Sequence, residues 1–152
     1  MIAEVIAADG AGLGVHLTYL APDGSGKYPF VDTLDQRESR GPIRGGAVRL
    51  AAHNYGRELI VAEGIETALS CMTLFDRPAW AALSASGLKS LDLPNEIRRV
   101  IVAGDHDKNG VGQRAAVSAF YRFKAEGRAV RLVIPPEPGT DFNDVLRARG
   151  DG

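Results

Sequence analysis

Acidic residues follow two apolar runs of this chain, each at the point where the run ends. Glu63 comes directly after Leu59–Ala62, and Asp105 and Asp107 follow Arg99–Ala103 across a single glycine. Both runs have the composition of buried β-strands and precede helix-like stretches. In a parallel sheet the carboxyl ends of neighbouring strands share one edge, where sites are usually built. Acids gathered there repel one another, so the pattern predicts a divalent cation.

Asp105 and Asp107 have other possible interpretations. An acidic turn that starts a helix explains them without any metal. A calcium loop requires a glutamate at its twelfth position, which is Ala116 here, and a helix before it, so this reading is rejected. An aspartyl phosphotransferase motif has Thr where this chain has Asn109, and it ranks low. We expect His106, between the two acids, to point away from the site.

Three further acids strengthen the metal hypothesis, although each has a structural alternative. Glu66 lies one helical turn beyond Glu63 and can face the same way, or it can stabilise the helix N-terminus. Asp141 and Asp144 follow the last apolar run and form a third acidic cluster at the same edge. N-capping of the final helix is the alternative for Asp141. Three clusters after three strands favour a shared site more than any one alone.

The elements that position these acids alternate between strand and helix from residue 58 onward. Strands are expected at 59–62, 79–83, 99–103 and 129–134, and helices at 65–75, 87–91, 111–126 and 141–149. This alternation predicts a parallel α/β sheet of about four strands, with helices on both faces. A shared site requires the strand order second, first, third, fourth, because only then do Glu63 and Asp105 leave adjacent strands.

The first 57 residues form a different, β-rich segment, and residues 58–152 form the α/β domain. Residues 14–20 alternate like a half-buried strand, and Pro22 with two following glycines predicts a turn over 22–26. We expect a β-hairpin, joined by residues 47–50. The stretch 37–57 holds five arginines and a single acid. It is either a solvated loop or a surface that contacts phosphates.

Composition sets the broad class. The chain has 152 residues, 45% hydrophobic and 24% charged, with a formal net charge of −1. These values are ordinary for a globular domain, and no global charge attracts nucleic acid. The lone Cys71 excludes an intramolecular disulfide and a multi-cysteine zinc site. No apolar run approaches a membrane span and no signal peptide is present, so we expect a cytoplasmic protein with no membrane partner.

The combination of Glu63 with Asp105 and Asp107 resembles the Toprim family, which is shared by bacterial-type primases, topoisomerases, OLD-type nucleases and recombination mediators. The stretches 63–70 and 141–146 are most similar to the primase and primase-helicase branch. Residues 19–24 and 41–50 resemble the segment before Toprim in plasmid- and phage-type primase-like proteins. The resemblance covers most of the chain and implies a Toprim-like Rossmannoid fold preceded by a small β-rich segment.

That resemblance implies metal-dependent nucleotidyl transfer, with RNA primer synthesis on single-stranded DNA as the expected activity. Mg²⁺ or Mn²⁺ would be held by the acids, with Glu63 also a general acid or base, and nucleoside triphosphates would be substrates. A zinc-binding or helicase domain would be supplied elsewhere, because this chain has one cysteine and no phosphate-binding loop. A metal-dependent nuclease and a non-catalytic binding module remain alternatives. The candidate residues are Glu63, Asp105 and Asp107 for catalysis and metal, Asp141 and Asp144 for metal, Glu66 as a secondary acid, and Arg44, Arg49, Lys108 and Arg114 for phosphate.

Overall fold

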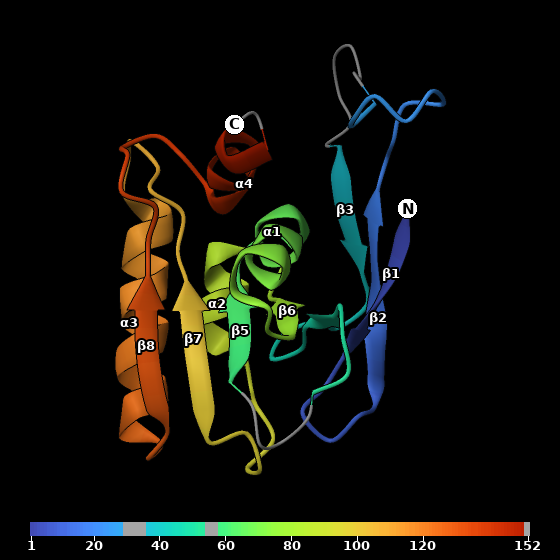
Figure 1. Cartoon of the computed structure of the whole chain (residues 1–152). Coiled ribbons are helices and arrows are strands. Elements are labelled where there is room, and N and C mark those ends of the chain that lie inside the picture. The colour runs from blue at the N-terminus through green and yellow to red at the C-terminus, as the bar shows by residue number, and fades with distance from the viewer. Residues whose placement is uncertain (29–35, 54–57, 151–152) are drawn as a thin grey trace.

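A five-stranded sheet forms the centre of the molecule (Figure 1). The computed structural model describes residues 1–28, 36–53 and 58–150. The strand order is β4-β6-β5-β7-β8, in which β5, β6, β7 and β8 are parallel and β4 is antiparallel. The strands are β4 (Val48–Arg49), β5 (Leu59–Ala62), β6 (Ala79–Ala81), β7 (Arg99–Ala103) and β8 (Ala129–Val133).

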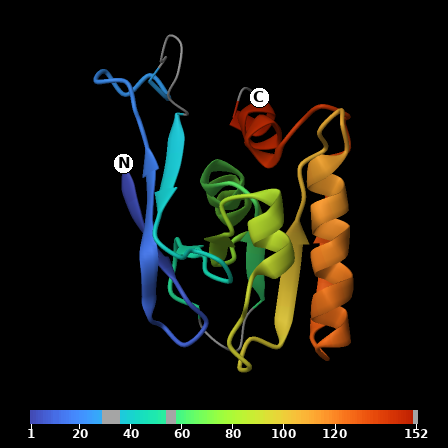
Figure 2. The ribbon, with the colours of Figure 1, turned by 180° about the vertical axis from the view of Figure 1, so that it is seen from behind.

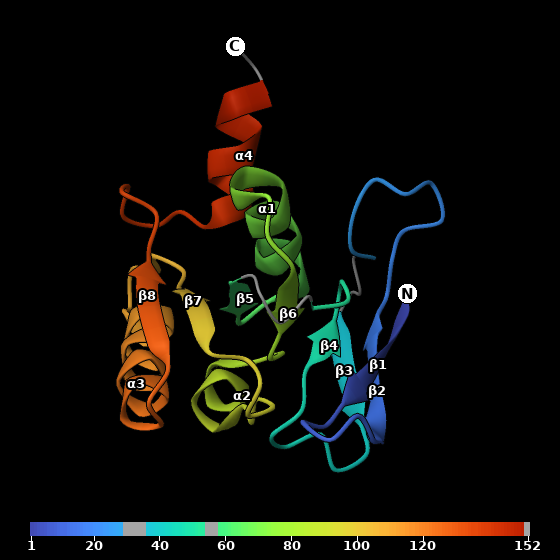
Figure 3. The same ribbon diagram turned by 60° about the horizontal axis from the view of Figure 1, so that its bottom comes forward.

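Helices cover both faces of this sheet, as expected from the alternation of strands and helices. The helices are α1 (Ile65–Phe75), α2 (Ala85–Ser90), α3 (Val111–Ala125) and α4 (Phe142–Gly150). Figure 2 looks onto the face covered by α2 and α3, and Figure 3 shows the sheet lying between that pair and α1 with α4. None of the helices in the described ranges is both long and apolar enough to cross a bilayer.

The side chains of β5 show why the sheet is buried on both faces. Leu59 and Val61 pack into the core cluster under α2 and α3, and Ile60 and Ala62 pack into the cluster under α1 and α4. All four are fully buried. Burial of a large aliphatic side chain contributes about 1.5–3 kcal/mol, so a continuous apolar run is stable only in such a doubly covered strand.

The register of the central strands places the predicted acids side by side. Among the four parallel strands the order is second, first, third, fourth, which confirms the expected arrangement. Ala62 of β5 lies level with Ala103 of β7. Glu63 and Asp105 therefore leave adjacent strands within two residues of this level pair, at the carboxyl edge of the sheet.

A second sheet is formed by the N-terminal residues. It contains β1 (Ile2–Ile6), β2 (Gly12–Thr18) and β3 (Arg37–Arg40) in antiparallel order β1-β2-β3. The expected strand at 14–20 corresponds to β2, and β3 is the antiparallel partner that the expected hairpin requires after the turn, whereas β1 was not expected. The turn over 22–26 is present: Ala21 N–H donates to the Gly26 carbonyl at 2.9 Å, and Gly24 has a φ of 73°.

Residues 47–50 join the N-terminal sheet, as expected, but only at Ala47, which exchanges backbone hydrogen bonds with Ile6 of β1 at 2.9 and 3.1 Å. Strand β4 instead pairs antiparallel with β6, so the main sheet has five strands. Val48 is only 5% exposed and belongs to the main core. Arg49 places its guanidinium 4.2 Å from the ring centroid of Trp80, which is 3% exposed. Burial of these groups ties the N-terminal segment to the α/β sheet.

Candidate active site

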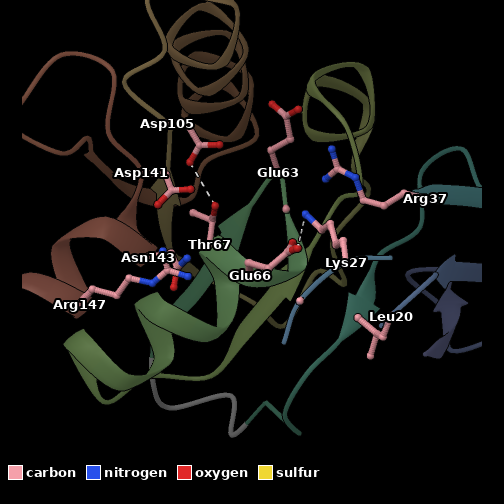
Figure 4. Close-up of a pocket in the computed structure, with 12 residues that line it drawn as sticks. Leu20, Lys27, Arg37, Glu63, Glu66, Thr67, Asp105, Asp141, Asn143 and Arg147 are labelled. Carbon is pink, nitrogen blue, oxygen red and sulfur yellow. Dashed lines mark hydrogen bonds and ion pairs between the residues drawn. The ribbon is translucent and has the colours of Figure 1, made fainter. Parts of the chain in front are cut away.

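Four of the predicted acids, Glu63, Glu66, Asp105 and Asp141, line one cleft of about 580 Å³ (Figure 4), and Asp107 and Asp144 lie outside its lining. Its walls come from the N-terminal segment, from the β5–α1 connection, and from the segments that follow β7 and β8. The lining residues are Leu20, Gly26, Lys27, Arg37, Glu63, Gly64, Glu66, Thr67, Asp105, Asp141, Asn143 and Arg147. Asp105 and Asp141 lie on one side of the cleft together with Arg147, and Lys27 and Arg37 enter on the other side from the N-terminal segment (Figure 4).

Asp105 is the most strongly perturbed carboxyl group of the cleft. Its Oδ1 accepts a hydrogen bond from the Thr67 hydroxyl at 3.2 Å, and Thr67 is only 4% exposed. Burial raises the pKa of Asp105 to about 6 despite this bond, and the charges of Asp141, Glu63 and Asp107 add to the rise. The group therefore lies among other acids in a poorly solvated place.

Asp107 is held by the start of α3. Its Oδ2 accepts from the backbone N–H of Gly112 at 2.9 Å. A Cβ at Gly112 would lie 2.9 Å from Asp107 Oδ1, so glycine leaves the room that this carboxylate needs. Oδ1 is buried, and within the described part of the chain it has no hydrogen-bond partner. A buried carboxylate oxygen without a hydrogen-bond partner calls for an explanation, and a bound cation would supply one.

Glu63 occupies the connection between β5 and α1. Burial and the Asp107 charge raise the pKa of Glu63, while the Ala85 backbone N–H and Arg37 oppose the rise. Its own carbonyl accepts from Leu83 N–H at 2.7 Å. Leu83 has a φ of 72°, a left-handed conformation that is rare and costly for a leucine. The strained residue therefore holds the backbone of the residue whose carboxylate is expected to act in catalysis.

Asp141 and Asp144 cap α4 reciprocally. Asp141 Oδ1 accepts from Asp144 N–H at 2.9 Å, and Asp144 Oδ2 accepts from Asp141 N–H at 3.1 Å. The N-capping expected of Asp141 is thus present, and Asp141 also lines the cleft beside Asp105 (Figure 4). Asp144 is exposed and does not line the cleft. The two acids therefore occupy different positions, and only Asp141 joins Glu63 and Asp105.

Glu66 forms an ion pair across the cleft. Its Oε1 lies 2.5 Å from Nζ of Lys27 in the N-terminal segment. Burial acts to raise the pKa of Glu66, but the hydrogen bond and charge of Lys27 and the charge of Arg37 outweigh it, so the pKa is lowered. Glu66 also lies in the first turn of α1, where an acid is favourable.

Three basic residues line the cleft, and of these only Arg37, from the basic stretch 37–57, was among the sequence candidates. Lys27 and Arg37 come from the N-terminal segment, and Arg147 comes from the last turn of α4. A signal for Arg147 was available, since it lies one helical turn beyond Asn143, which also lines the cleft. No local pattern indicated Lys27, because its place depends on contact with a helix 39 positions later.

The four expected phosphate-binding residues lie outside the cleft lining. Arg49 donates to the carbonyl of Ala7 at 2.5 Å, a contact that holds the two sheets together. Arg44 lines a separate cavity of about 530 Å³ with Lys89. Arg114 donates to the Asn109 carbonyl at 3.1 Å, and Lys108 is exposed. Residue 57, the last arginine of the basic stretch, lies outside the described residues.

The carboxylates suit a hard divalent cation in their chemistry. Oxygen ligands, the unpaired Asp107 Oδ1, and the raised pKa values of Glu63 and Asp105 all favour a bound positive charge. As the side chains stand, no three acidic, histidine or cysteine side chains of the described chain form a ready coordination set. A cation held by three of these side chains therefore requires rotation of at least one carboxylate.

Comparisons with known proteins agree with this geometry. A family model described as "Toprim domain" matches residues 58–152. The fold is similar to a DNA primase domain from Pseudomonas aeruginosa, with a TM-score of 0.55 and 18% identity over 96% of this chain and 52% of that one. It is similar to the Aquifex aeolicus primase zinc-binding and RNA polymerase domains, with a TM-score of 0.63 and 16% identity over 98% of this chain and 37% of that one.

A third similar structure is the DnaG primase catalytic domain bound to ssDNA. Its TM-score is 0.56, with 18% identity over 97% of this chain and 48% of that one. This chain thus spans between 37% and 52% of the solved chains it resembles. At these identities the likeness concerns the fold, and the N-terminal segment is part of it because nearly the whole chain is covered.

Proposed function

Because this chain belongs to the Toprim family, we propose that it catalyses metal-dependent phosphoryl or nucleotidyl transfer on nucleic acid, most specifically primer synthesis on single-stranded DNA. One observation carries the proposal: Glu63, Asp105 and Asp141 line the same cleft as Lys27, Arg37 and Arg147. The acids can hold a cation, and the basic side chains in the same cleft can hold phosphate groups. A reacting polyphosphate needs both.

Glu63, Asp105 and Asp107 are the proposed ligands of Mg²⁺ or Mn²⁺, with Asp141 beside them. A cation held there would stabilise the negative charge that develops on a transferred phosphoryl group. Thr67 and Gly112 support this set, because they donate hydrogen bonds to Asp105 and Asp107 respectively. Each donor leaves one oxygen of its carboxylate available.

Glu63 is also the proposed proton acceptor or donor. A carboxyl group exchanges protons best near neutral pH when its pKa is raised, and burial with the Asp107 charge does this for Glu63. We propose that a Glu63 carboxylate oxygen takes the proton from the attacking 3′ hydroxyl or returns one to the leaving oxygen.

Lys27, Arg37 and Arg147 are the proposed contacts to the phosphates of a nucleoside triphosphate or of the DNA strand. Charged donors of this kind bind phosphate oxygens strongly. Lys27 already pairs with Glu66, so an entering phosphate would compete with that carboxylate. Since related solved chains are about twice as long or longer, a zinc-binding or helicase partner is proposed to supply template recognition.

The test compares Glu63→Gln with Glu58→Gln in the chain joined to its natural neighbours. Both variants remove one carboxylate near β5, but Glu58 precedes this strand and pairs with Arg131 at the opposite edge. With ssDNA, nucleoside triphosphates and Mg²⁺ or Mn²⁺, Glu63→Gln should lose primer synthesis by more than about 100-fold, the usual scale for a general acid or base. Glu58→Gln should keep it.

Products decide between the proposal and its alternatives. Primer formation that depends on Glu63 supports nucleotidyl transfer. Degradation of ssDNA that depends on Glu63, without primers, replaces it with a metal-dependent nuclease. Equal activity of the two variants in either assay would remove Glu63 from the chemistry altogether.

A further inference from the structure

His106 makes three hydrogen bonds to the segment that carries Asp141. Its N–H donates to the Thr140 carbonyl at 3.0 Å, and its carbonyl accepts from Gly139 N–H at 2.5 Å. Its ring Nδ1 lies 2.9 Å from the Pro135 carbonyl. Because a carbonyl can only accept, Nδ1 carries the proton in this bond. The ring therefore points toward residues 135–140, away from the two aspartates that flank it.

The segment 135–140 has few other means of holding its shape. Three of its residues are prolines, which have no N–H to donate. Residues 136–139 are exposed, and only Pro135 is fully buried. Inside the segment, the Thr140 hydroxyl donates to the Glu137 carbonyl at 2.7 Å. The hydrogen bonds with His106 thus join this turn to the Asp105–Asp107 loop.

These contacts continue the connection between β7 and β8 beyond the ends of the strands. The parallel pairing ends at Ala103 and Val133, and Gly104 N–H still donates to the Val133 carbonyl at 3.0 Å. Two residues later, His106 forms the next backbone hydrogen bonds between the two segments, with Gly139 and Thr140. Asp105 lies between Gly104 and His106, and Asp141 comes directly after Thr140. Both aspartates therefore flank these contacts, and both line the cleft (Figure 4).

We propose that His106 is a positioning residue, which fixes residues 135–140 against the Asp105–Asp107 loop and thereby sets where Asp141 stands relative to Asp105. This inference rests on the proposed cation site, but His106 itself touches neither cation nor substrate. His106 lies between Asp105 and Asp107 in the sequence. It contributes to the site through Asp141, which belongs to another segment.

The first measurement is amide hydrogen exchange in the metal-free full chain. His106→Ala removes the ring bond and keeps the backbone bonds, whereas His106→Asn offers an amide nitrogen at the same number of bonds from Cα as Nδ1. We expect exchange at Gly139 and Thr140 to become about five- to tenfold faster in His106→Ala, the size of one lost hydrogen bond, and near wild type in His106→Asn. Gly104, in the strand ladder, should not change.

His16→Ala is the matched control. His16 is a buried histidine whose Nδ1 lies 2.8 Å from the Ser39 hydroxyl in the N-terminal sheet. Its loss should lower the melting temperature without changing exchange at Gly139 and Thr140. Equal exchange at these two amides in His106→Ala and wild type would overturn the proposal, as would the same acceleration in His16→Ala.

The second measurement is Mn²⁺ affinity, by titration calorimetry, in a double-mutant cycle of His106→Ala and Asp141→Asn. If His106 acts through Asp141, its substitution should weaken binding about fivefold in wild type and scarcely at all in Asp141→Asn. Additive losses, or no loss in the single variant, would overturn the proposal. Failure of the wild-type chain, joined to its natural neighbours, to make primer would instead reject the proposed function, while a non-additive cycle would still support the positioning role.

Discussion

The carboxyl group of Asp105 couples the stability of the metal-free protein to pH. Its pKa is about 6 when folded, above the ordinary value of 3.8. The folded state therefore binds this proton more tightly than the unfolded state, and the free energy of unfolding falls as pH rises from about 4 to 6. We expect Asp105→Asn, which cannot ionise, to show a smaller fall over this interval in denaturant titrations without metal.

Wild type and Asp105→Asn should therefore differ most in slope between pH 4 and 6, and little in slope below pH 4. Parallel stability curves across pH 4–6 would contradict the raised pKa. Thr67→Ser is a suitable companion variant, because it keeps the hydroxyl that donates to Asp105 and should retain the wild-type slope.

Asp107 gives the metal hypothesis a second test at the same scale. Mg²⁺ or Mn²⁺ that binds only the folded state should raise the melting temperature, by the equivalent of about 2.7 kcal/mol at 100 times its dissociation constant. Asp107→Asn should remove most of this rise, since the unpaired Oδ1 is the proposed ligand. Differential scanning calorimetry with and without the ion measures it. Asp76→Asn, at the far end of α1, is the control, and an equal response in both variants would place the ion elsewhere.

Among the elements, α2 depends most closely on a single glycine. A Cβ on Gly87 would lie 2.0 Å from the Ala82 carbonyl oxygen, which is far inside contact distance and meets backbone. Ala85, in the same first turn of α2, donates its backbone N–H to Glu63. Gly87→Ala should destabilise the fold by about 1–3 kcal/mol, as other overpacked sites do, despite the better helix propensity of alanine.

The neighbouring variant Ser86→Ala is the control for that measurement. Ser86→Ala also introduces alanine into α2, but at an exposed position, where only the hydroxyl contact to Ser84 is lost. Urea unfolding should show a change within about 0.5 kcal/mol for this variant. If Gly87→Ala were equally mild, the start of α2 would not approach the Ala82 carbonyl as closely as described.

Most elements after residue 58 could be predicted from the sequence, because their signals are local. Apolar runs of four or five residues marked β5 and β7, and helical spacing marked α1 and α3 within a residue of their observed ends. Strand β4 could not be predicted in its sheet. It has two residues, and its partner β6 lies about 30 positions later, so only burial of Val48 and the contact of Arg49 with Trp80 decide where it pairs.

The candidate site divides in the same way. The acids could be predicted because each follows a strand, and parallel strands bring their ends together. Lys27 could not, because it reaches the cleft only through the packing of the N-terminal segment. The basic stretch was recognised from its composition, but four of its arginines lie inside the described ranges and only Arg37 lines the cleft.

At the scale of the whole molecule, the cleft is built from both the N-terminal segment and the Toprim domain. Arg37→Ala should weaken ssDNA binding and lessen its salt dependence, because each phosphate contact on a single strand adds about 0.7 to the slope of log affinity against log salt. Fluorescence anisotropy of a labelled oligonucleotide at several salt concentrations measures both. The difference between variant and wild type should shrink as salt rises.

Arg98→Ala is the control for this effect. It removes the same charge from an exposed residue immediately before β7, at the amino edge of the sheet and away from the cleft. A smaller salt slope in Arg98→Ala than in Arg37→Ala would place DNA binding at the amino edge of the sheet and contradict the prediction. A reduced slope in Arg37→Ala alone agrees with a strand that enters the cleft.

The contact between Arg49 and Trp80 also gives the molecule an intrinsic optical reporter. Trp80 is the single tryptophan of the sequence, it is nearly fully buried, and its indole N–H donates to the Ala51 carbonyl at 3.3 Å. Its emission therefore reports one junction, where the N-terminal segment meets the central sheet. A red shift during titration with denaturant, nucleotide or DNA would signal that this junction has opened to water. The coupling of the two parts of the chain can thus be followed in real time without a label.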